Sequence, residues 1–258
     1  MKISGSTVLI TGANRGIGEA LAKEVARRGG NLVLVNRTAN PDLVKECKKL
    51  GAKDTKEILG DLSSQEGLEK LFSSLKKLEV DILINNAGQL TGGSLEDQPA
   101  EDIHNMFQVN VNALVQITKF FLPGMKKRGK GKIVNNASVS SYMYFPGAST
   151  YAASKSAVAA FSECMKAELQ GTGVSVLLLV TPGIETRMFR EIPKKYGNLI
   201  DTSFLKSIPA ETYGEKVCDS IESDVETLSP SGATAITLNI AKHLPGLFRK
   251  IATRRKKG

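Results

Sequence analysis

The feature that most constrains the fold of this chain is an alternation between short apolar runs rich in branched residues and longer stretches with helical periodicity. A short apolar run flanked by glycine, asparagine or charge is typical of a strand buried on both faces. Such strands alternating with helices indicate β-α-β units and a parallel sheet. Strands are predicted over residues 7–11, 31–36, 56–60, 80–85, 132–136 and 174–180. Helices are predicted over 16–28, 41–50, 64–77, 101–128 and 151–170.

Right-handed crossovers would arrange these strands as a doubly wound sheet, so the predicted fold class is α/β and Rossmann-type. The regularity fades after Pro182 and Gly183, where residues 184–209 are predicted to be a mobile segment of mixed character and 210–224 another helix. The sequence has no repeat and no linker. One domain over residues 1–235 with a tail over 236–258 is therefore predicted.

The net charge of +9 belongs mostly to the tail. Residues 236–258 hold seven lysines and arginines and no acid, which leaves 28 basic against 26 acidic residues in the rest. The basic tail has no interleaved aromatics and no recognition module around it, so nucleic-acid binding is not expected. The basic residues are Lys242, Arg249, Lys250, Arg254, Arg255, Lys256 and Lys257.

The tail also carries apolar residues at helical spacing, which predicts an amphipathic helix over 236–251 interrupted at Pro245 and Gly246. A basic amphipathic helix can rest on anionic lipid. It can equally dock on its own domain or on a partner subunit, with the charged end solvated. The sequence leaves these alternatives open. The apolar series is Ile236, Ile240, Leu244, Leu247, Phe248 and Ile251.

Cysteine and histidine usage points to a reduced compartment and no metal. Cys47, Cys164 and Cys218 are odd in number and far apart, and His104 and His243 are isolated. No run approaches the ~18 apolar residues of a spanning helix, and the start lacks the apolar stretch of a signal peptide. A cytoplasmic protein is predicted, with peripheral membrane association as the alternative that the tail leaves open.

The segment TGANRGIG at 11–18 follows the first predicted strand and opens the first helix. Glycine at 12 permits a tight turn, and Gly16 and Gly18 let backbone approach a pyrophosphate at the helix N-terminus. A strand–helix turn that binds nothing is the alternative. The position and spacing favour a dinucleotide site.

The end of the second strand indicates which dinucleotide. A site for NAD needs a carboxylate there for the ribose hydroxyls, whereas this chain has Asn36 and Arg37, with Arg15 nearby in the glycine turn. An arginine can bind the 2′-phosphate of NADP, although Arg37 could also be a solvated residue after a strand. Asp61 and Leu62 could contact the adenine, or Asp61 could start a turn.

Tyr151 and Lys155 are four residues apart at the start of a predicted helix, which places phenol and ammonium on one face. The pair alone is a weak signal in a lysine-rich chain. Its weight comes from Ser138, just past a strand, and from Asn110 within the long preceding helix.

These elements together resemble the single-domain short-chain dehydrogenases/reductases: TGANRGIG, Asn85-Asn86-Ala87-Gly88, Asn110, Ser138, Tyr151 with Lys155, and Pro182-Gly183 with Thr186 occur in family order over about residues 5–190. The resemblance implies an NADP(H)-dependent oxidoreductase with catalytic residues Asn110, Ser138, Tyr151 and Lys155. It implies that Tyr151 transfers the proton, Lys155 binds the nicotinamide ribose, Ser138 positions the substrate oxygen and Asn110 holds a water. Predicted cofactor contacts are Gly12, Asn14, Arg15, Gly16, Ile17, Gly18, Asn36, Arg37, Asp61, Leu62, Asn86, Ala87, Gly88, Tyr151, Lys155, Pro182, Gly183 and Thr186.

Elementary electrostatics agrees with the proposed pairing of Tyr151 and Lys155. A phenol with a pKa of ~10 is a poor base at neutral pH. A cation ~5 Å away contributes about 3 kcal/mol, or roughly two pKa units. Oxidised nicotinamide adds a second positive charge, and the two cations together are predicted to bring the pKa of Tyr151 down toward the working range.

The chain departs from the family pattern in two places. Family members usually end with a strand and a glycine-rich segment, whereas the basic tail here is more similar to aldehyde, retinoid and hydroxysteroid reductase branches. Asn136-Ala137-Ser138 replaces a run of one hydrophobic residue and two serines, which puts the geometry of that strand end in doubt.

The substrate signals are weaker than the cofactor signals. Met143, Tyr144 and Phe145, and later Met188, Phe189 and Tyr196, are expected to rim the cleft. They favour an apolar aldehyde or ketone, unless they only pack or gate the site. Alternatives are reduction of a 3-ketoacyl group on an acidic carrier protein and a catalytically silent nucleotide sensor. The resemblance also implies a homodimer or homotetramer built through helices near 101–128 and 151–170.

Overall fold

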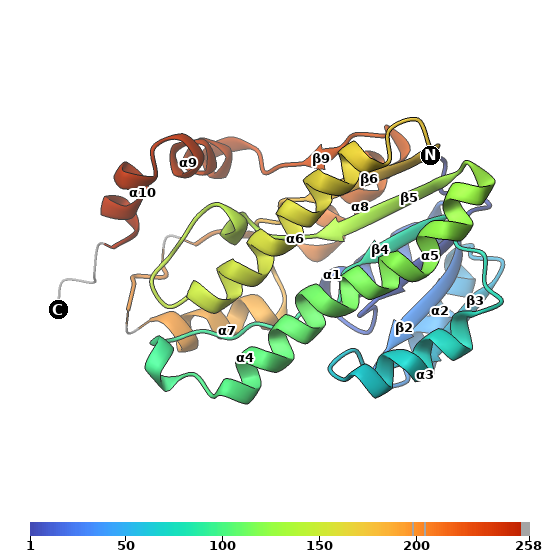
Figure 1. The fold of residues 1–258 in the computed structure, drawn as a ribbon, viewed down its shortest axis with the longest axis horizontal. Helices are drawn as coiled ribbons and strands as arrows, with labels where there is room; N and C mark the ends of the chain where they lie inside the picture. Colours follow the sequence, from blue (N-terminus) through green and yellow to red (C-terminus); the bar gives the residue numbers. More distant parts are fainter. Residues whose placement is uncertain (198, 204, 254–258) are drawn as a thin grey trace.

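The computed structural model describes residues 1–197, 199–203 and 205–253, without the side chain of residue 251. Seven parallel strands form one sheet in the order β3-β2-β1-β4-β5-β6-β9 (Figure 1). The order reverses at β1, as in a doubly wound sheet. The strands are β1 (Thr7–Thr11), β2 (Asn31–Asn36), β3 (Thr55–Leu59), β4 (Ile82–Asn85), β5 (Gly131–Asn136), β6 (Val174–Leu179) and β9 (Thr227–Leu228).

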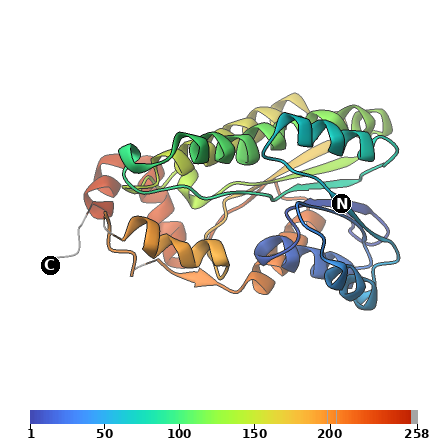
Figure 2. The same ribbon diagram turned by 90° about the horizontal axis from the view of Figure 1, so that it is seen from below.

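Helices cover both faces of this sheet (Figure 2). Alternate strand residues face opposite layers: Val8 and Ile10 join the core under α1, α2 and α8, whereas Leu9 joins the core under α3, α5 and α6. The helices are α1 (Gly16–Arg27), α2 (Pro41–Leu50), α3 (Gln65–Leu75), α4 (Ala100–Phe107), α5 (Leu114–Arg128), α6 (Ser149–Glu168), α7 (Arg187–Tyr196), α8 (Ala210–Glu222), α9 (Gly232–His243) and α10 (Pro245–Ala252).

The six predicted strands are confirmed, with small shifts at their ends. The strand β9 was not predicted, because two residues carry no readable period. The prediction of a mobile segment over 184–209 is wrong in part, since α7 lies within it, between the short paired strands β7 (Gly183–Ile184) and β8 (Ser207–Ile208). The predicted helix over 101–128 is present, but Gln108–Ala113 within it is π-helical.

The C-terminal helices pack on the domain itself. Leu238, Ala241, Phe248 and Ala252 are buried in a cluster with residues of β6 and α6. The ring of Phe248 meets that of Phe145 edge-on, with centroids 5.4 Å apart. The tail is thus docked in the way that one of the alternatives predicted.

The predicted apolar face of the tail is nevertheless divided between two helices that turn at Leu244 and Pro245. Ile236, Leu244 and Leu247 are exposed. The side chain of Ile251 and residues Arg254, Arg255, Lys256 and Lys257 lie outside the described residues. Among the described helices, none is long and apolar enough to cross a membrane.

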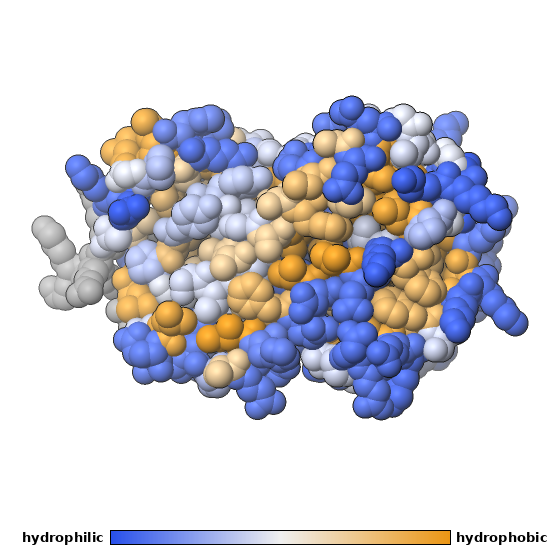
Figure 3. All heavy atoms as spheres, viewed as in Figure 1, coloured by the Kyte–Doolittle hydropathy of each residue, from blue (hydrophilic) through white to orange (hydrophobic). Residues whose placement is uncertain are grey.

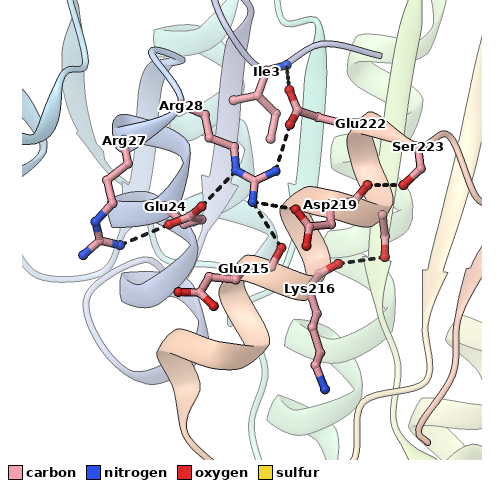
Figure 4. A network of polar contacts seen from close by, with 10 residues as sticks. Ile3, Glu24, Arg27, Arg28, Glu215, Lys216, Asp219, Glu222 and Ser223 are labelled. Carbon is pink, nitrogen blue, oxygen red and sulfur yellow. Dashed lines mark hydrogen bonds and ion pairs between the residues drawn. The ribbon is translucent and has the colours of Figure 1, made fainter.

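A charged cluster fixes α8 against α1 (Figure 4). The Arg28 guanidinium, at the end of α1, is within 2.8 Å of Asp219 and Glu222 and 2.9 Å of Glu24. Glu222 also accepts a hydrogen bond from the backbone of Ile3. These contacts join segments that are far apart in the chain. They involve none of the predicted site residues.

Candidate active site

One large cavity lies at the carboxyl ends of the parallel strands, where ligands bind in open α/β sheets. Its volume is about 1190 Å³. Every predicted site residue except Asn110 lines it, from the glycine turn after β1 to Tyr151 and Lys155 on α6. The structure therefore brings together residues spread over positions 12–186 of the chain.

The glycine turn forms a cradle that side chains would fill. Gly12 and Gly16 have φ values of +68° and +58°, which glycine adopts without strain. A Cβ on Gly12 would lie 2.9 Å from the Cα of Ala87, and one on Gly18 would lie 2.1 Å from the Gly12 carbonyl oxygen. The turn thus presents bare backbone at the start of α1, as a bound pyrophosphate requires.

The side chains at the end of β2 also fit a nucleotide. Asn36 is buried, and its amide donates to Glu57 over 2.8 Å, while its Oδ1 has no hydrogen-bond partner among the described residues. Asn14 donates to the carbonyl and hydroxyl oxygens of Thr38, which joins the glycine turn to the loop after β2. An unsatisfied buried oxygen beside an open cavity is suited to a ligand hydroxyl.

Two arginines border this end of the cavity, and both are exposed: Arg15 and Arg37. Neither forms an ion pair within the described part of the chain. Asp61 is engaged in a turn, where its carboxylate accepts from the backbone and hydroxyl of Ser63. These two bonds, and more weakly the charge of Arg37, lower the pKa of Asp61.

The predicted proton-transfer groups converge at the other side of the glycine turn. Tyr151 and Lys155 lie one turn apart on α6, with the Lys155 ammonium 5.9 Å from the centre of the phenol ring. Lys155 donates to the carbonyl oxygen of Asn136 over 2.7 Å. Ser138 follows β5, and its hydroxyl is close enough to the Tyr151 phenol to lower the pKa of that group. This arrangement places a hydroxyl, a phenol and an ammonium on one wall of the cavity.

The lowering of the Tyr151 pKa by Lys155 and oxidised nicotinamide together stays a prediction, and in the structure burial dominates the pKa values of both side chains. Burial raises the pKa of the phenol to about 12, and the nearby Ser138 hydroxyl only partly opposes it. Burial also lowers the pKa of the Lys155 ammonium to about 8. Burial shifts the two pKa values in opposite directions, because the charged form of each group loses hydration when it is removed from water.

Asn110 lies behind the cavity wall, in the π-helical segment. Its Oδ1 accepts from the backbone of Gln89 over 2.8 Å, and its Nδ2 donates to the Gln89 carbonyl and to the Ser154 hydroxyl. The Asn110 side chain therefore joins the loop after β4, at Gln89, to helix α6, at Ser154. The role of holding a water stays a prediction.

The substrate side of the cavity combines expected and unexpected residues. Met143, Phe145, Met188, Phe189 and Tyr196 line it as predicted, and Tyr144 does not. Ala233, Thr234 and Thr237 of α9 also line it. Sequence reasoning missed these three, since nothing in their composition distinguishes them from an ordinary helix.

A glycine turn at the start of a helix, two arginines beside the end of β2 and a converging Ser–Tyr–Lys set are the features expected of a nicotinamide-dependent oxidoreductase. The chain belongs to the short chain dehydrogenase family, whose model matches residues 6–197. Members of this family use NAD(P)(H) and act on CH–OH or C=O groups, and this protein is an oxidoreductase of that kind.

The relatives carry several substrate names. Ketoacyl reductase HetN of Nostoc sp. is 34% identical over 185 residues, which are 70% of this chain and 64% of that protein. Oxidoreductase UcpA of Salmonella typhimurium is 31% identical, with 81% of this chain and 82% of the relative aligned. Human 17-beta-hydroxysteroid dehydrogenase type 3 is 29% identical, with 87% and 74% aligned.

Solved structures share the whole fold. A short-chain dehydrogenase from Sphingobium yanoikuyae in complex with NADPH superposes with a TM-score of 0.79 at 27% identity, covering 98% of each chain. A short-chain dehydrogenase from Streptomyces avermitilis gives 0.80 at 22% identity and covers 97% of this chain and 96% of its own. The C-terminal region is thus included in the common architecture.

Proposed function

We propose that this protein is an NADP(H)-dependent reductase of apolar aldehydes or ketones. The observation that carries the proposal is a single cavity with Ser138, Tyr151 and Lys155 on one wall and the glycine turn beside it. Hydride transfer needs the cofactor and the substrate carbonyl in one such space. When bound, the nicotinamide supplies the hydride.

The side chains have separate tasks in this proposal. Ser138 orients the carbonyl oxygen by a hydrogen bond, and Tyr151 donates its phenolic proton to that oxygen as the carbonyl becomes an alcohol. The phenol is protonated at neutral pH, so Tyr151 can act as the proton donor in reduction. Lys155 would hold the nicotinamide ribose and, when charged, stabilise the phenolate left behind.

The preference for NADP rests on the adenosine end. Arg15 and Arg37 border the cavity without ion-pair partners in the described residues, and Asn36 stands where a site for NAD needs a carboxylate. The NADPH complex of a structural relative supports the same preference. The other predicted cofactor contacts lie along the same wall.

The test is a carbonyl panel run with NADPH and with NADH, following the loss of reduced-cofactor absorbance. Apolar aldehydes and ketones should be reduced, and NADPH should be preferred. A protein that binds NADPH but reduces no member of the panel would instead be a nucleotide sensor. The intact Ser138, Tyr151 and Lys155 set favours the enzyme.

A second candidate is reduction of a 3-ketoacyl thioester carried by an acidic group. Arg187, Arg190 and Lys206 line the cavity on its substrate side, and Arg190 and Lys206 have no ion-pair partner within the described chain. HetN, by name, is a ketoacyl reductase. Comparing acetoacetyl thioesters with free ketones of the same chain length distinguishes the two: a preference for the thioester, lost in Arg190→Gln, would select the second.

For the tail, we propose contact with an anionic membrane surface through α9 and α10. Leu244 and Leu247 are exposed beside the cations Lys242, Arg249 and Lys250, and residues 236–253 contain no acid. Wild-type protein should float with anionic vesicles, and Leu244→Ser with Leu247→Ser should not. Equal flotation of both would end this proposal.

A homodimer or homotetramer is proposed through α5 and α6. Neutral and apolar side chains cross the middle of the face that carries these helices (Figure 3). Ala153 and Ala160 of α6 are exposed there, which permits close helix packing. Light scattering should give a multiple of the chain mass, and Ala160→Arg should reduce it to one chain; a wild-type monomer would contradict the proposal.

A further inference from the structure

The strand ends beside the glycine turn are joined by a chain of buried side-chain hydrogen bonds. Asn86, at the end of β4, donates through Nδ2 to the carbonyl oxygens of Thr11 and Gly12, at 3.0 and 3.1 Å. Asn136, the last residue of β5, donates to Asn86 Oδ1 over 3.0 Å. Asn136 is one of the two residues, with Ala137, that depart from the family pattern at this strand end.

From Asn136, the series of hydrogen bonds continues away from the glycine turn. The hydroxyl of Thr181, after β6, donates to Asn136 Oδ1 over 2.5 Å. The phenol of Tyr213 on α8 is 2.8 Å from the same hydroxyl. Asn136, Thr181 and Tyr213 are 7%, 6% and 2% exposed, so little water is available to replace any of these bonds.

The carbonyl acceptors at the glycine turn fix which atom donates in each of these hydrogen bonds. The carbonyl oxygens of Thr11 and Gly12 only accept, so Asn86 must turn Nδ2 toward them and Oδ1 toward Asn136. Asn136 must then present Nδ2 to Asn86 and Oδ1 to Thr181. The single hydroxyl hydrogen of Thr181 is used there, and Tyr213 therefore donates to Thr181. All bonds run one way, from Tyr213 to the glycine turn.

Asn136 also touches the catalytic side. Its carbonyl oxygen accepts the 2.7 Å hydrogen bond from the Lys155 ammonium. The same residue thus holds Lys155 through its backbone and Asn86 through its side chain. The apolar residue usual in the family at this position could make only the first contact.

We propose that Asn136 is a positioning residue that couples the glycine turn to Lys155, with Thr181 and Tyr213 orienting its amide. The inference rests on the dinucleotide binding of the proposed function. It assigns cofactor affinity to side chains that contribute no phosphate contact of their own. The effect of a substitution on the Kd for NADPH should be largest at Asn136, smaller at Thr181 and smallest at Tyr213.

The experiment measures the Kd for NADPH by fluorescence titration of the purified full-length protein. Asn136→Leu should weaken binding about tenfold, because it leaves Asn86 Oδ1 without a donor and the Thr181 hydroxyl hydrogen without an acceptor. Thr181→Val should weaken it severalfold, and Tyr213→Phe less. Thr181→Ser keeps the donor and should bind like wild type.

The control is Ser162→Ala on α6, where Ser162 meets β5 on the face opposite to the Asn136 side chain. Ser162 is fully buried and accepts from Asn135 over 3.0 Å, in a separate set of bonds that reaches neither Lys155 nor the glycine turn. This variant should lose thermal stability without a change in Kd. A general loosening of the fold would instead weaken binding in Ser162→Ala and Thr181→Ser as well.

The outcomes separate cleanly. If Thr181→Val and Thr181→Ser bind NADPH equally, the inference is wrong, and this pair decides even where Asn136→Leu does not fold. Equal loss of affinity in Ser162→Ala also overturns it. If wild type binds neither NADPH nor NADH, the proposed function fails first, which is a distinguishable result.

Discussion

The two ends of the cavity are built in different ways. The nucleotide end is made from the ends of neighbouring strands and the turns that follow them, and its residues lie within positions 12–88. The substrate end is assembled from the segment after Ser138, from α7 and from α9, which are separated by long stretches of chain. The first end depends on local backbone geometry, and the second depends on how distant helices pack.

The difference between the two ends of the cavity predicts where substitutions should act. A change at the nucleotide end should alter cofactor affinity for every substrate. A change at the substrate end should alter substrate selection and leave the Kd for NADPH unchanged. Tyr151 stands between the two ends, and its substitution should act mainly on proton transfer rather than on the Kd for NADPH.

The largest expected effect is at Tyr151. Tyr151→Phe removes the proton donor and should reduce turnover by roughly 10²- to 10⁴-fold, while the Kd for NADPH stays within about twofold. Single-turnover assays and fluorescence titration measure the two quantities separately. Substantial remaining turnover would exclude Tyr151 from proton transfer.

The next effect tests the nucleotide end alone. Arg37→Asp introduces a carboxylate beside the expected 2′-phosphate, and one charge-assisted contact is worth roughly 1.5–3 kcal/mol. The preference for NADPH over NADH should fall by on the order of ten- to a hundredfold. Lys45→Gln, an exposed cation on α2, is the matched control and should leave that ratio unchanged. An unaltered ratio in Arg37→Asp would place the 2′-phosphate elsewhere.

A smaller effect is expected from Tyr196 at the substrate end. Its ring fills a slot against Gly92, where an added Cβ would lie 1.8 Å from the ring, and its phenol donates to the Thr91 carbonyl over 3.0 Å. Tyr196→Ala should open this end and shift kcat/KM toward bulkier carbonyls. Tyr196→Phe keeps the ring and removes only the hydrogen bond to Thr91, so it should lower the free energy of unfolding by about 1 kcal/mol and leave the substrate preference close to that of wild type. A change in the Kd for NADPH in either variant would contradict the separation of the two ends.

The smallest effect on activity is expected at the amino-terminal ends of the strands, on the side of the sheet away from the cavity. The Lys132 ammonium, buried in β5, is 2.6 Å from the Asp224 carboxylate. Asp224→Ala leaves that cation with only the Val225 carbonyl, 3.4 Å away, and should lower the free energy of unfolding by about 1.5–3 kcal/mol. Lys132→Met leaves an exposed carboxylate in water and should cost less. Equal losses would show that burial of the cation does not matter.

The same pair predicts a pH dependence. Lys132 lowers the pKa of Asp224 in the folded state. The contribution is therefore complete above the ordinary aspartate pKa and declines as the pH falls through the lowered one. Urea unfolding should show the difference between wild type and Asp224→Ala shrinking only in acid, with kcat unchanged at neutral pH.

Much of the nucleotide end could be predicted from sequence, because its signals are local. The glycine spacing, the apolar strand runs and the interval from Tyr151 to Lys155 are set by periodicity and steric need. Strand ends in a parallel sheet also meet at one edge, so residues that follow strands were placed together correctly.

At the substrate end, the sequence predicted that apolar residues line the cavity but did not predict the helices that carry them. The apolar residues of α7 were recognised, but their helix was not, because Pro193 and a run of charge obscure its period. The contribution of Thr237 depends on the packing of α9. The buried chain through Asn136 and the raised pKa of Tyr151 follow from tertiary neighbours and desolvation, which no spacing rule encodes.

The edge-on contact between Phe145 and Phe248 has a practical consequence for protein engineering. The loop just after Ser138 packs against α10, which lies about a hundred residues further along the chain. A hybrid that takes its first 180 residues from this protein and the remainder from a relative would exchange the support of that loop along with the tail. Such hybrids should therefore carry residues 232–252 with the loop they contact.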